Sequence, residues 1–320
     1  MKTVGIIGAN GYTGSELVRL LSFHPNVELS FLFSRSNAGV KISEIYPDLD
    51  SVCEMVLTDQ VQEVDVLFLC LPHKESQNWL QQNMISEETL IIDLGNDFRL
   101  EGKCGNRDFI YGLPEVNKAQ LIHSKSIANP GCFATAIQLA LLPLAKNRDL
   151  AEVYTTGITG STGAGVKLQP TTHFTNRNNN ISAYKTLTHQ HVEEILQQLN
   201  SFNGKEVKLN FVPWRGDFTR GIFTSSTVKT DMELSEIYKL YQEFYKYEPF
   251  VKVSETPIDL KQVVNTNRCV INIEKEGDVI VVHSAIDNLL KGASGQAVQN
   301  MNIALGWEEN LGLGLKPVAF

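Results

Sequence analysis

The fold is decided by the opening stretch Lys2-Thr3-Val4-Gly5-Ile6-Ile7-Gly8-Ala9-Asn10-Gly11-Tyr12-Thr13-Gly14. Residues 3–7 are mostly β-branched, which is typical of a strand, and residues 15–21 repeat leucine and valine at helical spacing. The glycines between them are spaced GxxGxxG, which suits a tight turn whose backbone approaches a ligand closely. A helix that starts after such a turn directs unpaired N–H groups at negative charge. The stretch therefore predicts a strand, a turn that binds the pyrophosphate of a dinucleotide, and a helix.

The residues expected to bind this dinucleotide follow the ends of three predicted strands. After the first strand they are Gly8, Asn10, Gly11, Tyr12, Thr13 and Gly14. The second strand, 27–33, is followed by Ser34, Arg35 and Ser36, where a protein that binds NAD usually has an acidic side chain for the ribose 2′-hydroxyl. Hydroxyls and a guanidinium suit a 2′-phosphate instead, so the sequence predicts NADP. The third strand, 64–71, ends in Leu71 and Pro72, at the edge where open α/β sheets bind ligands.

The order of predicted elements indicates an α/β protein of two domains. Strands and helices alternate up to residue 131, which predicts a Rossmann-like domain with a mostly parallel sheet. Longer strands follow at 153–159, 207–212, 221–229, 269–274 and 278–287, with helices at 191–200 and 234–245. The last helix, 293–305, is apolar on several sides and is expected to be buried against the first domain. We therefore expect an NADP-binding domain of residues 1–131 and 288–320. Residues 132–287 would form an α+β domain for catalysis and oligomerisation, with a largely antiparallel or mixed sheet.

Composition excludes several classes of protein. The formal net charge of −8 over 320 residues argues against non-specific binding of nucleic acid, and no apolar run approaches a membrane span. Five scattered cysteines without a CxxC pair argue against a disulfide framework or a zinc site, so no metal is expected. The N-terminus resembles a strand rather than a signal peptide, and we expect a cytoplasmic protein. The polar cluster 176–180 is expected to be a surface loop.

Cys132 is the candidate nucleophile. It follows Asn129-Pro130-Gly131 and stands at the start of a strongly apolar helix. Unpaired N–H groups and the helix dipole at that position favour a thiolate over a thiol. A small buried apolar side chain, the commoner role of a cysteine, would explain the same position.

A histidine pair is the candidate for proton transfer. In His189-Gln190-His191-Val192-Glu193-Glu194, helical spacing puts His191, Glu194 and Gln198 on one polar face, opposite Ile195 and Leu199. Glu194, three residues after His191, can reach the imidazole and hold one tautomer. His191 is the preferred acid and base, with His189 as the second choice. A solvated helix face would give the same pattern without a function.

Six segments resemble the N-acetyl-γ-glutamyl-phosphate reductase family, within the superfamily that includes aspartate-semialdehyde dehydrogenase. They are Gly8–Gly14, Asp93–Leu100, Tyr111–Glu115, Asn129–Cys132, Thr219–Ile222 and Asp287–Asn302. The resemblance implies NADPH-dependent reduction of an acyl phosphate in arginine biosynthesis through a thioester on Cys132, and a homodimer or homotetramer. It also places an HxHxxE pattern after a tyrosine-containing loop in the active site. One departure is Trp214, where relatives often have a histidine, so no base is expected there.

The substrate that the resemblance implies carries a phosphate and a carboxylate, both of which suit bidentate arginine. We expect Arg99 to bind the phosphate and Arg220 the carboxylate, with Arg215 as an alternative and with Asn129 and His189 as further contacts. Surface ion pairs would explain the arginines equally well. Ser161 and Gly163 belong to a loop that resembles a glycine loop of the family, and with Asn288 they are expected near the cofactor or the substrate carbonyl. A helix cap is the plainer role for Asn288.

Two other functions are compatible with the same residues. One is an acyl-phosphate reductase of the aspartate-semialdehyde dehydrogenase kind, and the other is a non-catalytic NADP-binding redox sensor. An aligned histidine and glutamate beside Cys132 argue against the sensor, which has no need of a base. Whether the acyl group is acetyl or succinyl is left open.

Overall fold

The computed structural model describes residues 1–148 and 150–318, which form two compact units. The first unit is Met1–Gly131 with Ala293–Gly314, and the second begins with Cys132–Gly292. Residues 288–292 and 315–318 therefore group with the second unit, whereas the sequence assigned them to the first. Residues 319–320 of that assignment lie outside the described residues.

The first unit contains a six-stranded sheet in the order β2-β1-β3-β4-β8-β7, with every neighbouring pair parallel. Its strands are β1 (Lys2–Ile7), β2 (Val27–Phe33), β3 (Val66–Leu69), β4 (Leu90–Asp93), β7 (Ile110–Tyr111) and β8 (Ser126–Ala128). Its helices are α1 (Tyr12–Leu21), α2 (Ile42–Ile45), η1 (Pro47–Leu49), α3 (Ser76–Gln82), α4 (Pro114–Leu121) and α9 (Ser294–Ala304). A small ribbon of β5 (Lys103–Cys104) and β6 (Arg107–Asp108) stands apart from the sheet. The predicted parallel Rossmann-like sheet is thus confirmed.

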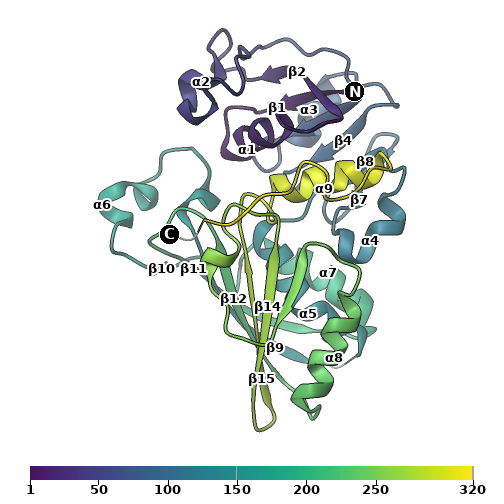
Figure 1. Ribbon diagram of the computed structural model, residues 1–320, viewed down its shortest axis with the longest axis vertical. Coiled ribbons are helices and arrows are strands. Elements are labelled where there is room, and N and C mark those ends of the chain that lie inside the picture. Colours follow the sequence, from purple (N-terminus) through teal and green to yellow (C-terminus); the bar gives the residue numbers. More distant parts are fainter. Residues whose placement is uncertain (149, 319–320) are drawn as a thin grey trace. The chain divides into compact units, whose positions relative to one another are not determined.

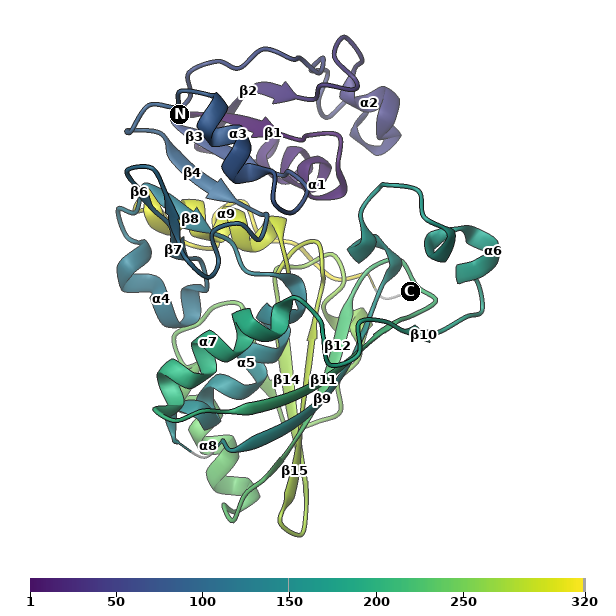
Figure 2. The ribbon, with the colours of Figure 1, turned by 180° about the vertical axis from the view of Figure 1, so that it is seen from behind.

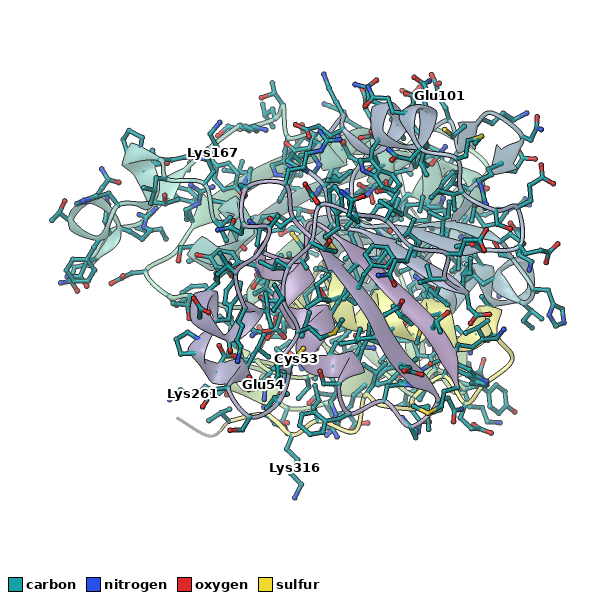
Figure 3. The ribbon with its side chains drawn as sticks, turned by 90° about the horizontal axis from the view of Figure 1, so that it is seen from above. Cys53, Glu54, Glu101, Lys167, Lys261 and Lys316 are labelled. Carbon is teal, nitrogen blue, oxygen red and sulfur yellow. The ribbon has the colours of Figure 1, made fainter. Side chains whose placement is uncertain are left out.

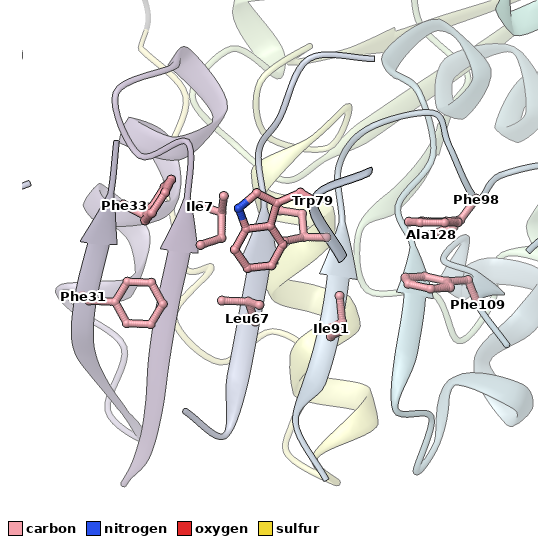
Figure 4. Packing of buried hydrophobic residues seen from close by; sticks show 10 residues of the cluster. Ile7, Phe31, Phe33, Leu67, Trp79, Ile91, Phe98, Phe109 and Ala128 are labelled. Atoms are coloured by element: carbon pink, nitrogen blue, oxygen red, sulfur yellow. The ribbon is translucent and has the colours of Figure 1, made fainter. Parts of the chain in front are cut away.

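Apolar side chains from neighbouring strands form the core of the first unit. Figure 4 shows Trp79 of α3 among side chains of this cluster, beside Ile7 and Leu67. At the end of the row, Phe98 and Phe109 stack with ring centroids 4.0 Å apart. These residues alternate with the opposite face along each strand, which is why β-branched and aromatic residues fill the strands.

Helix α9 is buried along its whole length although half of its side chains are polar. The burial is tolerable where these polar side chains form hydrogen bonds. Nδ2 of Asn300 donates to the Gly112 carbonyl at 2.9 Å and to Oδ1 of Asn129 at 3.0 Å, and Asn302 lies 3.0 Å from a ring nitrogen of His24. The helix packs on α1, α4 and β4 of the first unit.

The second unit contains a seven-stranded mixed sheet in the order β10-β11-β9-β12-β15-β14-β13. Its strands are β9 (Glu152–Thr159), β10 (Ser182–Ala183), β11 (Lys208–Arg215), β12 (Ile222–Lys229), β13 (Val251–Ser254), β14 (Cys269–Glu276) and β15 (Val279–Ile286). The β9–β11 and β13–β14 pairs are parallel and the other pairs are antiparallel. The mixed sheet agrees with the sequence prediction, although the short strand β13 was not predicted.

Three helices cover one face of this sheet, namely α5 (Cys132–Lys146), α7 (His191–Asn203) and α8 (Leu234–Phe244) (Figure 1). They pack on it through α5 with β12 and β15, α7 with β11, and α8 with β14. The hydroxyls of Tyr241 and Tyr245 donate to backbone carbonyls of α5, which fixes α8 against that helix. A further short helix, η4 (Leu260–Gln262), precedes β14.

The segment between β9 and α7 carries only short elements, which are η2 (Ser161–Ala164), η3 (Pro170–Thr172), α6 (Phe174–Arg177) and β10 (Figure 2). Much of it is exposed, and Lys167 projects into solvent in Figure 3. The loop predicted at 176–180 is corrected in part, because Asn176 and Arg177 belong to α6. Arg177 is buried and donates to the Asn180 carbonyl, so this cluster contains a tethered turn.

Within the described residues, no helix combines the length and the apolar character needed to cross a bilayer.

Asp93, at the carboxyl end of β4, is a buried acid with one oxygen paired and one not. Its Oδ1 accepts from the Ser76 hydroxyl at 2.6 Å and from the Gly95 N–H at 3.1 Å. Within the described chain Oδ2 has no hydrogen-bond partner. Burial raises the pKa of Asp93 from 3.8 to about 6, against the opposing effects of Ser76, Gly95 and Arg99.

We expect this carboxyl to make stability depend on pH in a defined direction. The folded pKa is raised, so the folded state holds more protons between pH 3.8 and about 6, and stability falls as pH rises through that window. A shift of about two units corresponds to about 3 kcal/mol. The free energy of unfolding of the native chain minus that of Asp93→Asn should therefore fall by about this amount between pH 4 and pH 7. Urea unfolding of both proteins across this range measures it, and a difference that is flat with pH would show that Asp93 is ionised normally.

Candidate active site

The glycine turn of the first unit has the backbone that a dinucleotide requires. Gly8 has φ of +81°, a left-handed value that favours glycine. A Cβ on Gly14 would lie 2.5 Å from the Gly8 carbonyl oxygen, so only glycine allows α1 to start this close to β1. Gly11 is the N-cap of α1, forms no side-chain cap, and no acidic residue occupies the first turn. The N-terminus of α1 thus fits an anionic group.

The predicted ribose-binding residues lie together beside this turn. Nδ2 of Asn10 lies 3.4 Å from the Ser36 hydroxyl, and the hydroxyls of Ser34 and Ser36 are also 3.4 Å apart. Ser34 is buried and Arg35 is exposed. Leu71 and Pro72 follow β3, which ends at Leu69, two residues earlier than predicted. The structure therefore brings the predicted residues to the carboxyl ends of β1, β2 and β3, which are neighbours in the sheet.

Cys132 is the first residue of α5 and is half-buried. A Cβ on Gly292 would lie 2.8 Å from the Cβ of Cys132 and 2.7 Å from the carbonyl oxygen of Asn288. Any side chain at 292 would therefore displace the cysteine. Gly292 was not predicted to matter for the site, because a glycine outside a recognisable turn carries no signal of what it approaches.

His189 stands in a cluster of aromatic rings beside this helix. Its ring centroid lies 4.7 Å from that of His191, 5.7 Å from Phe133 and 5.5 Å from Phe211, all at steep interplanar angles. The backbone N–H of His191 donates to Nδ1 of His189 at 3.2 Å. Because Nδ1 accepts, the neutral His189 ring carries its proton on Nε2. The two histidines of the predicted pair are thus brought together.

His191 and Glu194, on the predicted polar face of α7, are buried rather than solvated. His191 and Glu194 are only 5% and 3% exposed, as buried as their apolar neighbours on the helix. The reason is that α7 packs along α5, where Nε2 of Gln138 donates to the Glu194 carbonyl at 3.0 Å. A solvated helix face therefore does not explain the His191–Glu194 spacing.

Tyr184 is a member of the cluster that the sequence did not single out by number. Its ring centroid lies 5.7 Å from that of His189, and the guanidinium carbon of Arg215 lies 4.9 Å from the Tyr184 ring centre. Burial, and then the nearby Cys132, raise the pKa of Tyr184, whereas Arg215 acts to lower it. The tyrosine is therefore within electrostatic reach of the cysteine.

A turn with unusual backbone joins Tyr184 to His189. Lys185 and Leu187 have φ of +45° and +59°, although neither is glycine. The Leu187 N–H donates to the Phe211 carbonyl at 2.9 Å, and the Thr188 N–H donates to the Lys185 carbonyl at 3.0 Å. Backbone strain of this kind concentrates at functional sites.

Arg99 and Asn129 are both buried within the first unit and hold its backbone. Nε of Arg99 donates to the Asn129 carbonyl at 2.9 Å and Nη2 donates to the Leu94 carbonyl at 3.0 Å. The side-chain Nδ2 of Asn129 donates to the Ala293 carbonyl at 3.1 Å. These contacts brace the start of α9, and the predicted contacts of Arg99 and Asn129 with substrate stay predictions.

Arg220 is held by an ion pair inside the second unit. Its Nε and Nη2 lie 3.1 and 3.3 Å from the two oxygens of Asp287, whose side chain is fully buried. The same carboxylate accepts from the N–H of Asn265 at 2.7 Å and of Leu289 at 2.8 Å. Arg220 thus serves the structure of the unit, and its predicted contact with substrate stays a prediction.

Asn288 joins two loops of the second unit. Its Oδ1 accepts from the Gly221 N–H at 2.7 Å and its Nδ2 donates to the Thr162 hydroxyl at 3.0 Å. Thr162 lies between Ser161 and Gly163, the two loop residues predicted near the cofactor. The structure brings these three predicted residues together, and their contact with cofactor stays a prediction.

Comparison with known proteins places both units in one family. Residues 3–124 match the semialdehyde dehydrogenase NAD binding domain, and residues 132–288 match the semialdehyde dehydrogenase dimerisation domain. The chain is 52% identical to a protein of Phocaeicola vulgatus named N-acetyl-gamma-glutamyl-phosphate reductase, over the whole length of both chains. A protein of the same name from Flavobacterium johnsoniae is 51% identical, again with full coverage of both.

Solved structures share the fold at low identity. Aspartate semialdehyde dehydrogenase II from Vibrio cholerae superposes with a TM-score of 0.72 at 16% identity, covering 95% of this chain and 98% of that one. Aspartate semialdehyde dehydrogenase from Candida albicans, solved with NADP, gives 0.70 at 15% identity with the same coverage. These likenesses concern the fold alone. On the family models and the full-length relatives, the chain belongs to the N-acetyl-γ-glutamyl-phosphate reductase family, built from the two semialdehyde dehydrogenase domains.

Proposed function

We propose that the protein reduces an N-acyl-L-glutamyl 5-phosphate to the 5-semialdehyde and phosphate, with NADPH, as a step of arginine biosynthesis. The observation that carries the proposal is the position of Cys132 at the start of α5, within electrostatic reach of Tyr184. The Tyr184 ring packs edge-on against His189, which in turn contacts the buried His191. Full-length relatives named for this reaction support it.

The first step falls to Cys132. Its thiolate attacks the carbonyl carbon of the acyl phosphate, the bond from that carbon to the phosphate oxygen breaks, and phosphate leaves as a thioester forms on sulfur. The N-terminus of α5 supports the negative charge of the thiolate. Gly292 leaves the Cβ of Cys132 in place, since any larger residue would push on it.

Proton transfer is assigned to His191, with His189 as the second choice. Both rings are buried and in contact, so a proton on either is shielded from bulk water. Glu194 lies one turn along the buried face of α7, where we assign it the role of holding His191. His189 has its Nδ1 engaged by the His191 N–H, which leaves Nε2 as the atom that carries a proton toward substrate.

The cofactor is assigned to the first unit. Gly8, Asn10 and Gly11–Gly14 would hold the pyrophosphate, and Ser34, Arg35 and Ser36 would hold the 2′-phosphate of NADP. Arg35 is exposed, and none of the described carboxylates pairs with it, so its charge is available to a phosphate. When bound, the reduced nicotinamide supplies the hydride that converts the thioester to the aldehyde. Leu71 and Pro72, with Ser161, Gly163 and Asn288 of the second unit, are the remaining proposed contacts.

Substrate anchoring is proposed as follows. Arg99 is kept as the phosphate contact and Asn129 as a further substrate contact. Arg99 donates to the carbonyls of Asn129 and Leu94, which directly follow β8 and β4. The carboxylate is assigned to one of the two arginines predicted for it, Arg220 or its alternative Arg215. We place the protein in the cytoplasm, since its cysteines are spaced for a reducing compartment.

We also propose a homodimer or homotetramer assembled through the second unit. The three long helices pack on one face of the seven-stranded sheet, and the other face presents Tyr154, Thr156 and Ile158 of β9. Tyr154 is 56% exposed there. Thr156 lies at the middle of that face, between Val212 of β11 and Ser225 of β12. An open, weakly polar sheet face in a domain whose family model is named for dimerisation suits a second copy of this chain.

Replacing Cys132 with serine should abolish turnover and spare cofactor binding. In the reverse direction, with NADP, phosphate and an N-acylglutamate semialdehyde, kcat should fall by about a thousandfold or more, because a hydroxyl is a far weaker nucleophile. The Kd for NADPH should stay within about twofold. Cys104→Ser, at a half-buried cysteine of the first unit, is the matched control and should keep its activity. Wild-type turnover by Cys132→Ser would overturn the thioester route.

Replacing Arg35 with glutamate should weaken the binding of NADPH and leave the binding of NADH unchanged. Loss of a charge-assisted contact with the 2′-phosphate, and repulsion by the new carboxylate, should raise the Kd for NADPH about 10- to 100-fold. Fluorescence titration with each nucleotide measures this, and Arg268→Glu, at an exposed arginine of the second unit, is the control. An unchanged preference for NADPH would rule out the assignment of Arg35.

A lysine at Thr156 should break the assembly. The native chain of 35.7 kDa should scatter light as a dimer or tetramer, and Thr156→Lys should shift it to smaller species, because two copies would bring like charges together. Gln60→Lys, at an exposed site of the first unit, makes the same charge change and should leave the mass unaltered. A monomeric native chain at tens of micromolar would refute the proposed interface.

A further inference from the structure

Arg215 has a setting unlike that of the other arginine considered for substrate. It is the last residue of β11, where it pairs with Thr159 of β9 and Ser182 of β10. Its Nη1 lies 3.5 Å from the Thr171 hydroxyl, a long contact, and its Nε is buried without a hydrogen-bond partner in the described chain. No carboxylate of the described residues lies within ion-pairing distance of it. The charge of Arg215 is therefore not matched by the protein, and a buried donor without an acceptor is costly.

Arg220 differs on each of these points. Its guanidinium is held at two nitrogens by Asp287, whose buried carboxylate also accepts hydrogen bonds from the backbone N–H groups of Asn265, Leu289 and Leu290. An arginine neutralised in this way offers little net charge to a ligand, and moving it would leave a buried carboxylate unpaired. Of the two arginines in the Trp214–Gly221 segment, only Arg215 has a charge that no carboxylate of the described residues neutralises.

Arg215 also lies next to the reacting cluster. Its guanidinium carbon lies 4.9 Å from the ring centre of Tyr184, and the ring centroid of Tyr184 lies 5.7 Å from that of His189. The ring of His189 in turn lies 4.7 Å from that of His191, centroid to centroid. Arg215 thus contacts the aromatic cluster that contains both histidines.

We propose that Arg215 binds a carboxylate of the substrate, while Arg220 serves the fold of the unit; this rests on the proposed function. Distance from the reacting atoms favours a carboxylate over the phosphate. The phosphate is bonded directly to the carbonyl carbon that Cys132 attacks, whereas the carboxylates of an N-acylglutamyl group lie several bonds away. Arg215 lies over the ring of Tyr184, which suits the more remote anion. A planar guanidinium matches a carboxylate with two parallel hydrogen bonds.

Two parts of the substrate can supply that carboxylate. One is the α-carboxylate of the glutamyl group, which every N-acyl substrate carries. The other is a carboxylate on the acyl group itself, which a dicarboxylic acyl group such as succinyl has and acetyl lacks. Arg215 would recognise the carboxylate group in either case. Comparing an N-acetyl with an N-succinyl substrate shows which of the two carboxylates it binds.

The first experiment is reverse-direction turnover of Arg215→Gln and Arg215→Lys with N-acetyl- and N-succinyl-glutamate semialdehyde. We expect Arg215→Gln to raise KM about 10- to 100-fold with kcat within about threefold, and Arg215→Lys to recover part of the loss. An equal loss with both substrates identifies the α-carboxylate, and a loss confined to the succinyl substrate identifies the acyl group. An unchanged KM for both substrates overturns the proposal. Arg268→Gln makes the same charge change at an exposed site and should leave KM as it is.

The second experiment needs no turnover and separates this proposal from the proposed function. Cys132 is alkylated with iodoacetate, which carries a carboxylate, and with iodoacetamide, which does not, and the modified peptide is followed by mass spectrometry. The positive charge of Arg215 should raise the concentration of an anionic reagent around the cluster without binding its carboxylate directly. The ratio of the two rates should therefore fall about three- to tenfold in Arg215→Gln and hold in Arg268→Gln. An equal ratio in the two variants would refute the role of Arg215. Absence of turnover with either semialdehyde, alongside a lowered ratio, would count against the reductase function alone.

The variants must also be shown to fold. Arg215→Lys keeps a cation over Tyr184 and is the safer replacement, and its thermal midpoint is compared with that of the native chain. Arg220→Gln is the structural counterpart, and we expect its midpoint to drop well below that of Arg215→Gln because Asp287 loses its partner. A larger drop for Arg215→Gln than for Arg220→Gln would reverse the roles assigned to the two arginines.

Discussion

The second unit depends on a close approach that only glycine allows. The backbone at residue 292 comes so near the start of α5 that an added Cβ would lie 2.8 Å from that of Cys132. Two residues just before Gly292 anchor this segment. Asp287 forms an ion pair with Arg220, and Asn288 forms hydrogen bonds with Gly221 and Thr162. One short turn after β15 therefore sets the position of the nucleophile, the start of β12 and the loop of η2 at once. Backbone proximity and polar anchors therefore help to place the nucleophile.

Buried polar groups do much of the work of specifying the structure in both units. Asn300 and Asn129 hold α9 to the strands of the first unit, and Asp287 and Asn288 do the same for the loops of the second. Each such group would destabilise the fold without its partners. Burying an amide or a carboxylate that has no hydrogen bond costs up to about several kcal/mol. Networks of this kind favour one arrangement over many, since an alternative packing would leave some of them unmatched.

The sequence predicted the elements well wherever local pattern decides them. Strand β2 begins and ends at the predicted residues, since turn residues flank a run of strand-forming side chains. The glycine turn was predictable for the same reason, because conformation there follows from the glycines themselves. Strand β13 was missed because it has only four residues and pairs in parallel at the sheet edge, with nothing local to mark it.

The candidate site was less predictable because its members are chosen by distant partners. The sequence put His191 and Glu194 on one polar face of a helix and left a solvated face open as the alternative. Only the packing of α7 on α5 shows both side chains to be buried. Arg220 was preferred to Arg215 because nothing in the sequence reveals that Asp287, 67 residues further on, captures its guanidinium. The resemblance pointed to a tyrosine-containing loop without identifying the contacts of Tyr184. Its contacts with Arg215 and His189 depend on how β10 pairs with β11. Such pairings depend on tertiary contacts rather than on spacing along the chain.

The left-handed turn at Lys185 and Leu187 limits which sequence changes this segment can accept. Each non-glycine residue in that conformation costs about 1 kcal/mol, so side chains there are free to change toward glycine or asparagine without penalty. Length is another matter, because the turn is pinned to the Phe211 carbonyl and has Tyr184 and His189 at its two ends. A single inserted or deleted residue would move one aromatic ring relative to the other. Evolution is therefore permissive toward substitution in this turn and intolerant of insertion, the reverse of what an exposed loop ordinarily allows.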